Sequence, residues 1–148
     1  MSDLVTSDSV IMRQRMVDGQ VRTSDVTDQR IIEAMLTVPR ESFVPDGKAA
    51  MAYLDLDFEV GENRFLLKPV VVARLLQAAE IRRTDTVLVV GCASGYTAAV
   101  AAMLAHQVRA TDPDAALVAC ARASLDKLGL TNVSVSIAAP AEGDSAQA

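Results

Sequence analysis

The sequence predicts an α/β fold, the first half of a doubly wound parallel sheet, preceded by an N-terminal helical arm. Thr86–Val90 is an unbroken apolar run of the kind found in strands that are buried on both faces. A glycine-bounded turn, Gly91–Gly95, and an alanine-rich helix follow it directly. Strand and helix patterns then alternate up to Ile137, which gives the order β-α-β-α-β expected for one half of such a sheet.

The N-terminal arm is expected to contain two helices. Between Ser9 and Gln20 apolar residues recur at helical spacing, and Gly19 can end this amphipathic helix. A second helix begins with Thr27 as its cap and runs to the helix breaker Pro39. A short turn and a loop containing proline and glycine follow, so we assign residues 1–60 to a helical arm and loop.

The segment before the first parallel strand contains one uncertain element and one clear helix start. In Tyr53–Phe58 apolar residues alternate with aspartates, which indicates a short exposed strand. We expect Gly61–Lys68 to be a loop that enters a helix at Pro69, because proline suits the first helical turn.

The α/β unit is assigned to residues 61–137. After the first strand we expect a helix, a strand, a second helix and a third strand, in the order Tyr96–Leu104, Gln107–Asp112, Ala115–Leu128 and Asn132–Ile137. Residues 138–148 are rich in Ala, Gly, Ser and Pro and lack periodicity, so we predict a disordered tail there.

The predicted sheet has an open edge. A doubly wound sheet continues on the far side of its first strand, and no further strand follows Ile137 to pair with Thr86–Val90. Either the chain is a shortened form of a longer product, or another chain covers this apolar edge. The second reading predicts a homo-oligomer formed through the open edge.

Composition excludes several classes of protein. The net charge is −5 and the pI about 4.8, which disfavours a nucleic acid as partner. The apolar run Ala98–Ala105 is far shorter than the ~20 residues of a membrane span, and Met1–Leu4 lacks the features of a secretory signal, so we expect a cytoplasmic protein without a membrane partner. Cys92, Cys120 and the single His106 have no metal-ligand spacing, so no metal is expected.

The loop after the first strand is the candidate binding site. Gly91 permits an immediate turn, Gly95 permits close approach of the backbone to a ligand, and the following helix directs free N–H groups at an anionic group. Asp112 stands 21 residues after Gly91 at the end of the second strand, where an acid can accept both hydroxyls of a ribose. These features predict a nucleoside-containing ligand. The alternatives are that the glycines serve only the turn and that Asp112 only caps a helix.

The loop pattern favours one nucleoside over another. A dinucleotide fingerprint G-x-G-x-x-G requires glycine at Ala93 and a small residue at Tyr96, so a nicotinamide oxidoreductase is disfavoured and stays only as a third alternative. The spacing Gly91-x-Ala93-x-Gly95 is closer to the methyltransferase loop E-x-G-x-G-x-G, whose ligand is S-adenosylmethionine. Val89 and Ala93 replace the acid and one glycine of that loop.

Four segments occur in a characteristic order, namely Met16–Arg22, Val38–Pro45, Val87–Tyr96 and Leu125–Val133. Together they resemble the protein-L-isoaspartate (D-aspartate) O-methyltransferase family. The resemblance implies a Rossmann-like S-adenosylmethionine-dependent methyltransferase fold. It also implies methyl esterification of isoaspartyl carboxylates in damaged proteins or peptides, the first step of their repair. By position, the methionine part of the cofactor would be held by Gly91, Cys92, Ala93, Ser94 and Gly95, and its ribose by Asp112.

Two departures from the family pattern leave two hypotheses. The family's Thr-Ile-Ser-Gln-Pro segment falls on Phe65–Pro69, so Leu67 replaces the serine expected near the acceptor and can neither donate a hydrogen bond nor relay a proton. The Gly-Asp pair expected after the third strand falls near Ala138–Ala139. The catalytic residue is therefore unknown. The chain is either an O-methyltransferase of this type, with an acceptor that can differ from the family's, or a catalytically inactive relative that acts as a cofactor-binding or protein-interaction module.

Overall fold

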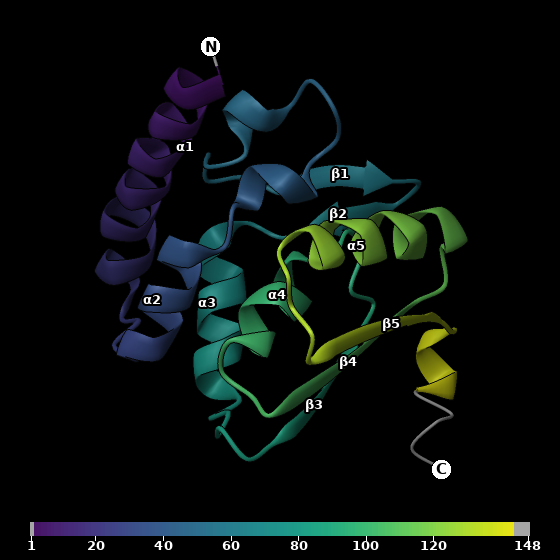
Figure 1. The fold of residues 1–148 in the computed structure, drawn as a ribbon. Coiled ribbons are helices and arrows are strands. Elements are labelled where there is room, and N and C mark those ends of the chain that lie inside the picture. The colour runs from purple at the N-terminus through teal and green to yellow at the C-terminus, as the bar shows by residue number, and fades with distance from the viewer. Residues whose placement is uncertain (1, 144–148) are drawn as a thin grey trace.

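The computed structural model describes residues 2–143. Its N-terminal part is a helical layer, as expected: α1 covers Ser2–Met16 and α2 covers Gln29–Thr37, and the two lie side by side in Figure 1. Between them the chain makes a π-helical turn, Val17–Val21, and a 3-10 turn, Arg22–Ser24.

Two details of the arm differ from the sequence prediction. Gly19 does not end the first helix, because Val17 and Val21 on either side of it are both fully buried and keep the backbone on a helical path. The second helix is capped by Asp28 and not by Thr27. The Asp28 carboxylate accepts a hydrogen bond from the Arg30 amide at 2.9 Å, which satisfies a donor of the first turn.

An antiparallel hairpin replaces the loop expected between residues 61 and 68. Its strands are β1, Phe58–Gly61, and β2, Arg64–Leu66, and Glu59 pairs with Phe65. The strand expected at Tyr53–Phe58 is absent because Tyr53 is buried and its hydroxyl is hydrogen-bonded within the arm. Strand pairing therefore begins at Phe58, and the hairpin lies beside α5 in Figure 1.

The α/β unit confirms the predicted order of elements. Helix α3, Pro69–Ala78, leads to a three-stranded parallel sheet of order β3-β4-β5. The strands and the helices between them are β3 Thr86–Val90, α4 Tyr96–Ala102, β4 Gln107–Asp112, α5 Ala115–Lys127 and β5 Val133–Ile137. Val90 pairs with Thr111 and Asp112 with Ile137, so the carboxyl ends of the strands form one edge.

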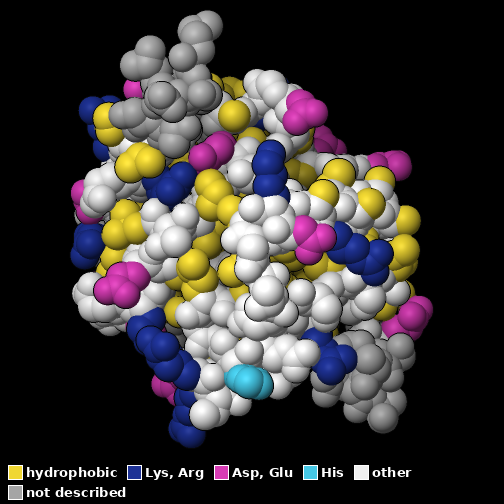
Figure 2. All heavy atoms as spheres, viewed as in Figure 1, with side chains coloured by type: hydrophobic (Ala, Val, Ile, Leu, Met, Phe, Trp, Pro, Cys, Tyr) yellow, Lys and Arg dark blue, Asp and Glu magenta, His cyan; other side chains and the backbone are white. Residues whose placement is uncertain are grey.

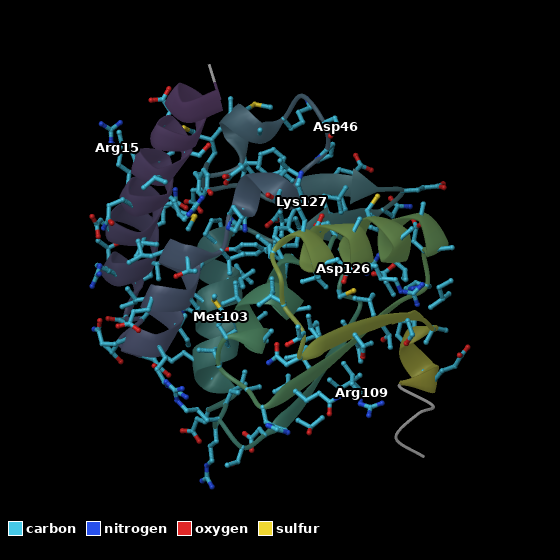
Figure 3. All side chains as sticks on the ribbon, viewed as in Figure 1. Arg15, Asp46, Met103, Arg109, Asp126 and Lys127 are labelled. Atoms are coloured by element: carbon cyan, nitrogen blue, oxygen red, sulfur yellow. The ribbon has the colours of Figure 1, made fainter. Side chains whose placement is uncertain are left out.

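The sheet is covered on one face and not on both, which corrects the expectation for Thr86–Val90. Helices α4 and α5 pack on the same side of the sheet (Figure 1). On the other face Leu88 and Val90 remain 43% and 44% exposed. Arg109 of β4 lies on this open face in Figure 3, as strand alternation requires when Val108 and Ala110 face the helices.

One hydrophobic core joins the arm to the α/β unit. It runs from Met16 and Met35 of the helical layer through Tyr96 and Val100 of α4 to Val135 of β5. Beyond β5, the Ala138 amide donates to the Asp112 carbonyl at 3.1 Å, and Pro140–Glu142 form a 3-10 turn. This turn corrects the expectation of disorder for residues 138–143, while the rest of the predicted tail lies outside the described residues. No helix within residues 2–143 is long and apolar enough to cross a membrane.

Candidate functional site

The loop after β3, Gly91–Gly95, lies at the carboxyl edge of the sheet. Gly91, Ala93 and Gly95 all have positive φ angles, of 73°, 51° and 99°. The amides of Gly91 and Cys92 both donate to the Thr111 carbonyl, at 2.8 and 2.9 Å, and this fixes the loop against the end of β4. Glycine is required at residue 95, where a Cβ atom would lie 3.0 Å from the Ala121 Cβ atom of α5.

Asp112 lies against this loop, as the sequence predicted. It is fully buried at the end of β4, and its Oδ2 atom accepts a hydrogen bond from the Ala93 amide at 2.9 Å. Its Oδ1 atom accepts from the Asp114 amide at 2.9 Å. The alternative in which Asp112 only caps a helix is wrong, because Asp114 caps α5 through the amides of Ala116 and Leu117. We call Gly91–Gly95 together with Asp112 the cradle.

Arg64 of β2 also reaches the cradle, which the sequence did not predict. Its Nη2 atom forms an ion pair with the Asp112 Oδ2 atom at 2.5 Å. The same Nη2 atom lies 3.1 Å from the position that a Cβ atom on Gly91 would occupy. The Arg64 side chain is 29% exposed, and its Nε atom is buried without a hydrogen-bond partner. Arg64 therefore fills the space between the loop and the acid.

Cys92 and Ser94 of the loop have different surroundings. Burial, followed by the negative charge of Asp112, raises the pKa of the Cys92 thiol to about 12, so this thiol stays protonated and is no nucleophile near neutral pH. The Ser94 Oγ atom is buried without a hydrogen-bond partner and lines a cavity of about 420 Å³. Other residues lining this cavity are Phe43, Val60, Leu117, Cys120 and Ser124.

Arg40 connects three segments around the cradle. Its guanidinium is fully buried and lies over the Tyr96 ring, 4.8 Å from the centroid. Its Nε atom donates to the Ala52 carbonyl at 2.6 Å, and its Nη2 atom donates to the Leu67 carbonyl at 2.8 Å. Burial lowers the pKa of Arg40, and the electrostatic interaction with the Tyr96 hydroxyl opposes that shift. Leu67 is thus held by its backbone, and its side chain is 38% exposed.

A hydrogen-bonded cluster of Tyr53, Glu41 and Arg13 stabilises the arm next to Arg40. The Tyr53 hydroxyl donates to Glu41 and accepts from the Arg13 Nε atom at 2.9 Å and from the Arg40 amide at 3.1 Å. Arg13 also forms an ion pair with Glu41 at 3.2 Å. Burial, followed by the hydrogen bond to Glu41, raises the pKa of Tyr53, so the phenol stays neutral. These contacts fix the turn that contains Arg40.

The surface charges and the positions of potential metal ligands describe the surroundings of the cradle. On the face shown in Figure 2, Lys and Arg side chains are interspersed with Asp and Glu side chains. Within residues 2–143 no three His, Cys, Asp or Glu side chains gather in a way that could hold a metal ion. The structure brings Gly91, Ala93 and Asp112 together, and it links Leu67 to the loop after β3 through Arg40 and Tyr96.

Known proteins match this chain over most of its length. The family model for protein-L-isoaspartate(D-aspartate) O-methyltransferase matches residues 12–148. A protein-L-isoaspartate O-methyltransferase of Geobacter metallireducens is 42% identical over 86% of this chain and 59% of its own length. One from Koribacter versatilis is 41% identical over 92% of this chain and 61% of its own length. The chain spans about 60% of the length of these two relatives.

Solved structures agree on the fold. A protein-L-isoaspartate O-methyltransferase superposes with a TM-score of 0.77 at 21% identity and covers 89% of this chain and 44% of its own. A Plasmodium falciparum protein, described as a beta-aspartate methyltransferase in complex with S-adenosyl-L-homocysteine, gives a TM-score of 0.64 at 15% identity, over 86% of this chain and 62% of its own. At these identities the structures establish a shared architecture, and the sequence matches establish the family. The chain therefore belongs to the protein-L-isoaspartate(D-aspartate) O-methyltransferase family.

Proposed function

We propose that this chain binds S-adenosylmethionine in the cradle and acts in methyl transfer to the side-chain carboxylate of isoaspartyl residues in proteins or peptides. The hydrogen bond between the Ala93 amide and the Asp112 carboxylate carries this proposal, because it joins the loop and the acid in one site. The relatives that match the chain bear the name of this activity, and one structural neighbour is in complex with S-adenosyl-L-homocysteine.

The cradle fits such a cofactor by the shape of its backbone. The positive φ angles at Gly91, Ala93 and Gly95 turn the loop so that its backbone, and not side chains, faces a ligand. Gly91–Gly95 would hold the methionine part and Asp112 the ribose. When bound, S-adenosylmethionine supplies an electrophilic methyl group on a sulfonium.

The protein's own contribution would be largely positional. A carboxylate is already a nucleophile near neutral pH, so in-line attack needs no strong base, and alignment supplies much of the acceleration. Arg40 supports this alignment by holding the Leu67 backbone and the Tyr96 ring at once. Leu67 offers no hydroxyl to the acceptor, so any contact there with the acceptor carboxylate has to come from elsewhere.

A second candidate function is a catalytically inactive, cofactor-binding or protein-interaction module. Leu67 at the position of the family's serine favours it, as does the Arg64 guanidinium on Asp112. We also infer that the partners do not include nucleic acid, that the protein works in the cytoplasm, and that copies associate through the β3 edge. Leu88 and Val90, both exposed on β3, support association.

Two measurements test the proposed function. Isothermal titration calorimetry with S-adenosylmethionine should give saturable binding, with nicotinamide adenine dinucleotide as the control ligand that should not bind. Transfer of a radiolabelled methyl group to an isoaspartyl peptide is then compared with transfer to the aspartyl peptide of the same sequence. Binding with selective transfer supports the enzyme. Binding without transfer to either peptide supports the inactive cofactor-binding module, and absence of cofactor binding overturns the enzyme and leaves only a protein-interaction module.

A further inference from the structure

The Asp112 carboxylate already accepts three hydrogen bonds before any ligand arrives. Its Oδ1 atom accepts from the Asp114 amide, and its Oδ2 atom accepts from both the Ala93 amide and Arg64. The two amides belong to the backbone of the loop and of the turn before α5, so they hold the carboxylate in place. The third donor is the end of a long side chain, and it alone can withdraw without unfolding the site.

The Arg64 guanidinium also occupies the space in front of the loop. Its Nη2 atom pairs with the Asp112 carboxylate and lies 3.1 Å from the position that a Cβ atom on Gly91 would occupy. A ribose hydroxyl that donates to Asp112 from this side would overlap with the guanidinium. A nucleoside and Arg64 therefore cannot hold this position together.

We propose that Arg64 is an affinity-setting residue that competes with the nucleoside of the ligand for Asp112. This inference rests on the proposed function, in which Asp112 receives a ribose. Binding then exchanges a charged donor for neutral hydroxyls, so part of the binding free energy is used to break the Arg64–Asp112 ion pair.

The structure permits Arg64 to leave. The residue lies in a three-residue strand of a two-stranded hairpin, its side chain is 29% exposed, and its Nε atom has no hydrogen-bond partner to lose. Since the pair is partly open to solvent, dissolved salt weakens it. The affinity for a neutral nucleoside should therefore rise with ionic strength, which is opposite to ordinary electrostatic attraction of a charged ligand.

The test uses calorimetric titration of the wild-type chain, Arg64→Met and Arg64→Gln with two probes. Adenosine carries only the nucleoside, and S-adenosyl-L-homocysteine adds the amino-acid carboxylate. The matched control is Arg74→Met, which removes an exposed arginine of α3 and changes the net charge equally. We expect Arg64→Met to bind both probes about tenfold more tightly than wild type, Arg64→Gln to be intermediate, and Arg74→Met to equal wild type.

The possible outcomes separate this inference from the proposed function. If Arg64→Met binds S-adenosyl-L-homocysteine more weakly than wild type but binds adenosine equally well, the competition is overturned. Arg64 is then a ligand of the amino-acid carboxylate. Equal or weaker binding of both probes overturns it as well. If none of the proteins binds either probe, the proposed function fails and the inference fails with it. Should Arg64→Met fail to fold, the affinity of the wild type for adenosine is compared at low and high salt. Competition by Arg64 requires this affinity to increase with salt, and an unchanged or lower affinity overturns the inference.

Discussion

The Arg40 guanidinium lies over the Tyr96 ring, with 4.8 Å between the Arg40 Cζ atom and the ring centroid. Tyr96 is the first residue of α4 and directly follows the loop Gly91–Gly95, while Arg40 belongs to a 3-10 turn of the helical arm. Because Arg40 also donates to the carbonyls of Ala52 and Leu67, one buried cation fixes the arm, the hairpin exit and the loop relative to each other.

Replacing Arg40 should destabilise the fold. In Arg40→Met the Ala52 and Leu67 carbonyls lose their donor, while the cost of burying a charge disappears. We expect a net loss of about 2–3 kcal/mol in the free energy of unfolding, measured by urea denaturation followed by circular dichroism. Arg74→Met, on the exposed side of α3, is the control and should change it by less than about 0.5 kcal/mol. Equal stability of the two variants would show that Arg40 is not a brace.

Comparing alanine substitutions at Gly95 and Gly129 separates the cost of steric crowding at Gly95 from the cost of backbone strain. Gly95 and Gly129 both have positive φ, of 99° and 72°, but a Cβ atom meets Ala121 at 3.0 Å only at Gly95 and nothing within 4 Å at Gly129. Gly129→Ala should cost about 1 kcal/mol from strain, and Gly95→Ala about 2–4 kcal/mol because overpacking adds to it. Thermal and urea unfolding measure both. The same loss of unfolding free energy in both variants would mean that α5 shifts to accommodate the added methyl group at no measurable cost.

The sheet could be predicted from the sequence because its signals are local. Thr86–Val90 is an apolar run that ends at Gly91, Gln107–Asp112 is a short segment bounded by Pro113, and the structure confirms both strands at these bounds. Asp112 could be placed beside the loop because parallel strands end at one edge. The structure adds the hydrogen bond from Ala93.

Arg64 and Arg40 could not be assigned because their contacts are not local. Arg64 reaches Asp112 across 48 positions through a hairpin of short strands, which no periodicity marks. Arg40 is a charged residue in a loop-like segment, where the usual expectation is exposure, yet it is fully buried. The one available signal was the resemblance of Val38–Pro45 to a family segment, and it did not indicate burial.

The Cys92 thiol should make the fold less stable in alkali. Its pKa is raised from 9.0 to about 12 by burial, so the unfolded chain releases this proton first as the pH rises. The stability that the protonated thiol contributes is complete below about pH 9 and is lost between pH 9 and 12, with a slope of about 1.4 kcal/mol per pH unit. Urea unfolding at pH 8 and pH 10 should show a smaller loss in Cys92→Ala than in wild type. The exposed Cys120→Ala variant is the control and should behave like wild type.

The open side of β3 should drive association of the chain. Leu88 and Val90 are 43% and 44% exposed on a strand whose outer edge is unpaired within the described residues. Sedimentation equilibrium of the wild type should show dimers or larger species that dissociate on dilution, and Leu88→Lys should shift the mass to that of a monomer. Leu75→Lys places the same charge at a 56%-exposed position of α3 and should leave association unchanged. A monomeric wild type at every concentration would exclude this interface.

Leu67→Ser tests whether the acceptor side of the site lacks a single hydroxyl. The Leu67 backbone is held by Arg40 and its side chain is 38% exposed, so the exchange should change the free energy of unfolding by less than about 1 kcal/mol. If a hydroxyl here orients the acceptor carboxylate, methyl transfer to an isoaspartyl peptide should rise about tenfold or more in kcat. The affinity for S-adenosyl-L-homocysteine should stay the same, because Leu67 is not part of the cradle. Leu75→Ser is the control for a leucine-to-serine exchange away from the site and should leave the rate unchanged. A rate in Leu67→Ser equal to that of the wild type would place the limitation elsewhere, and the Arg64–Asp112 ion pair would be the next contact to remove.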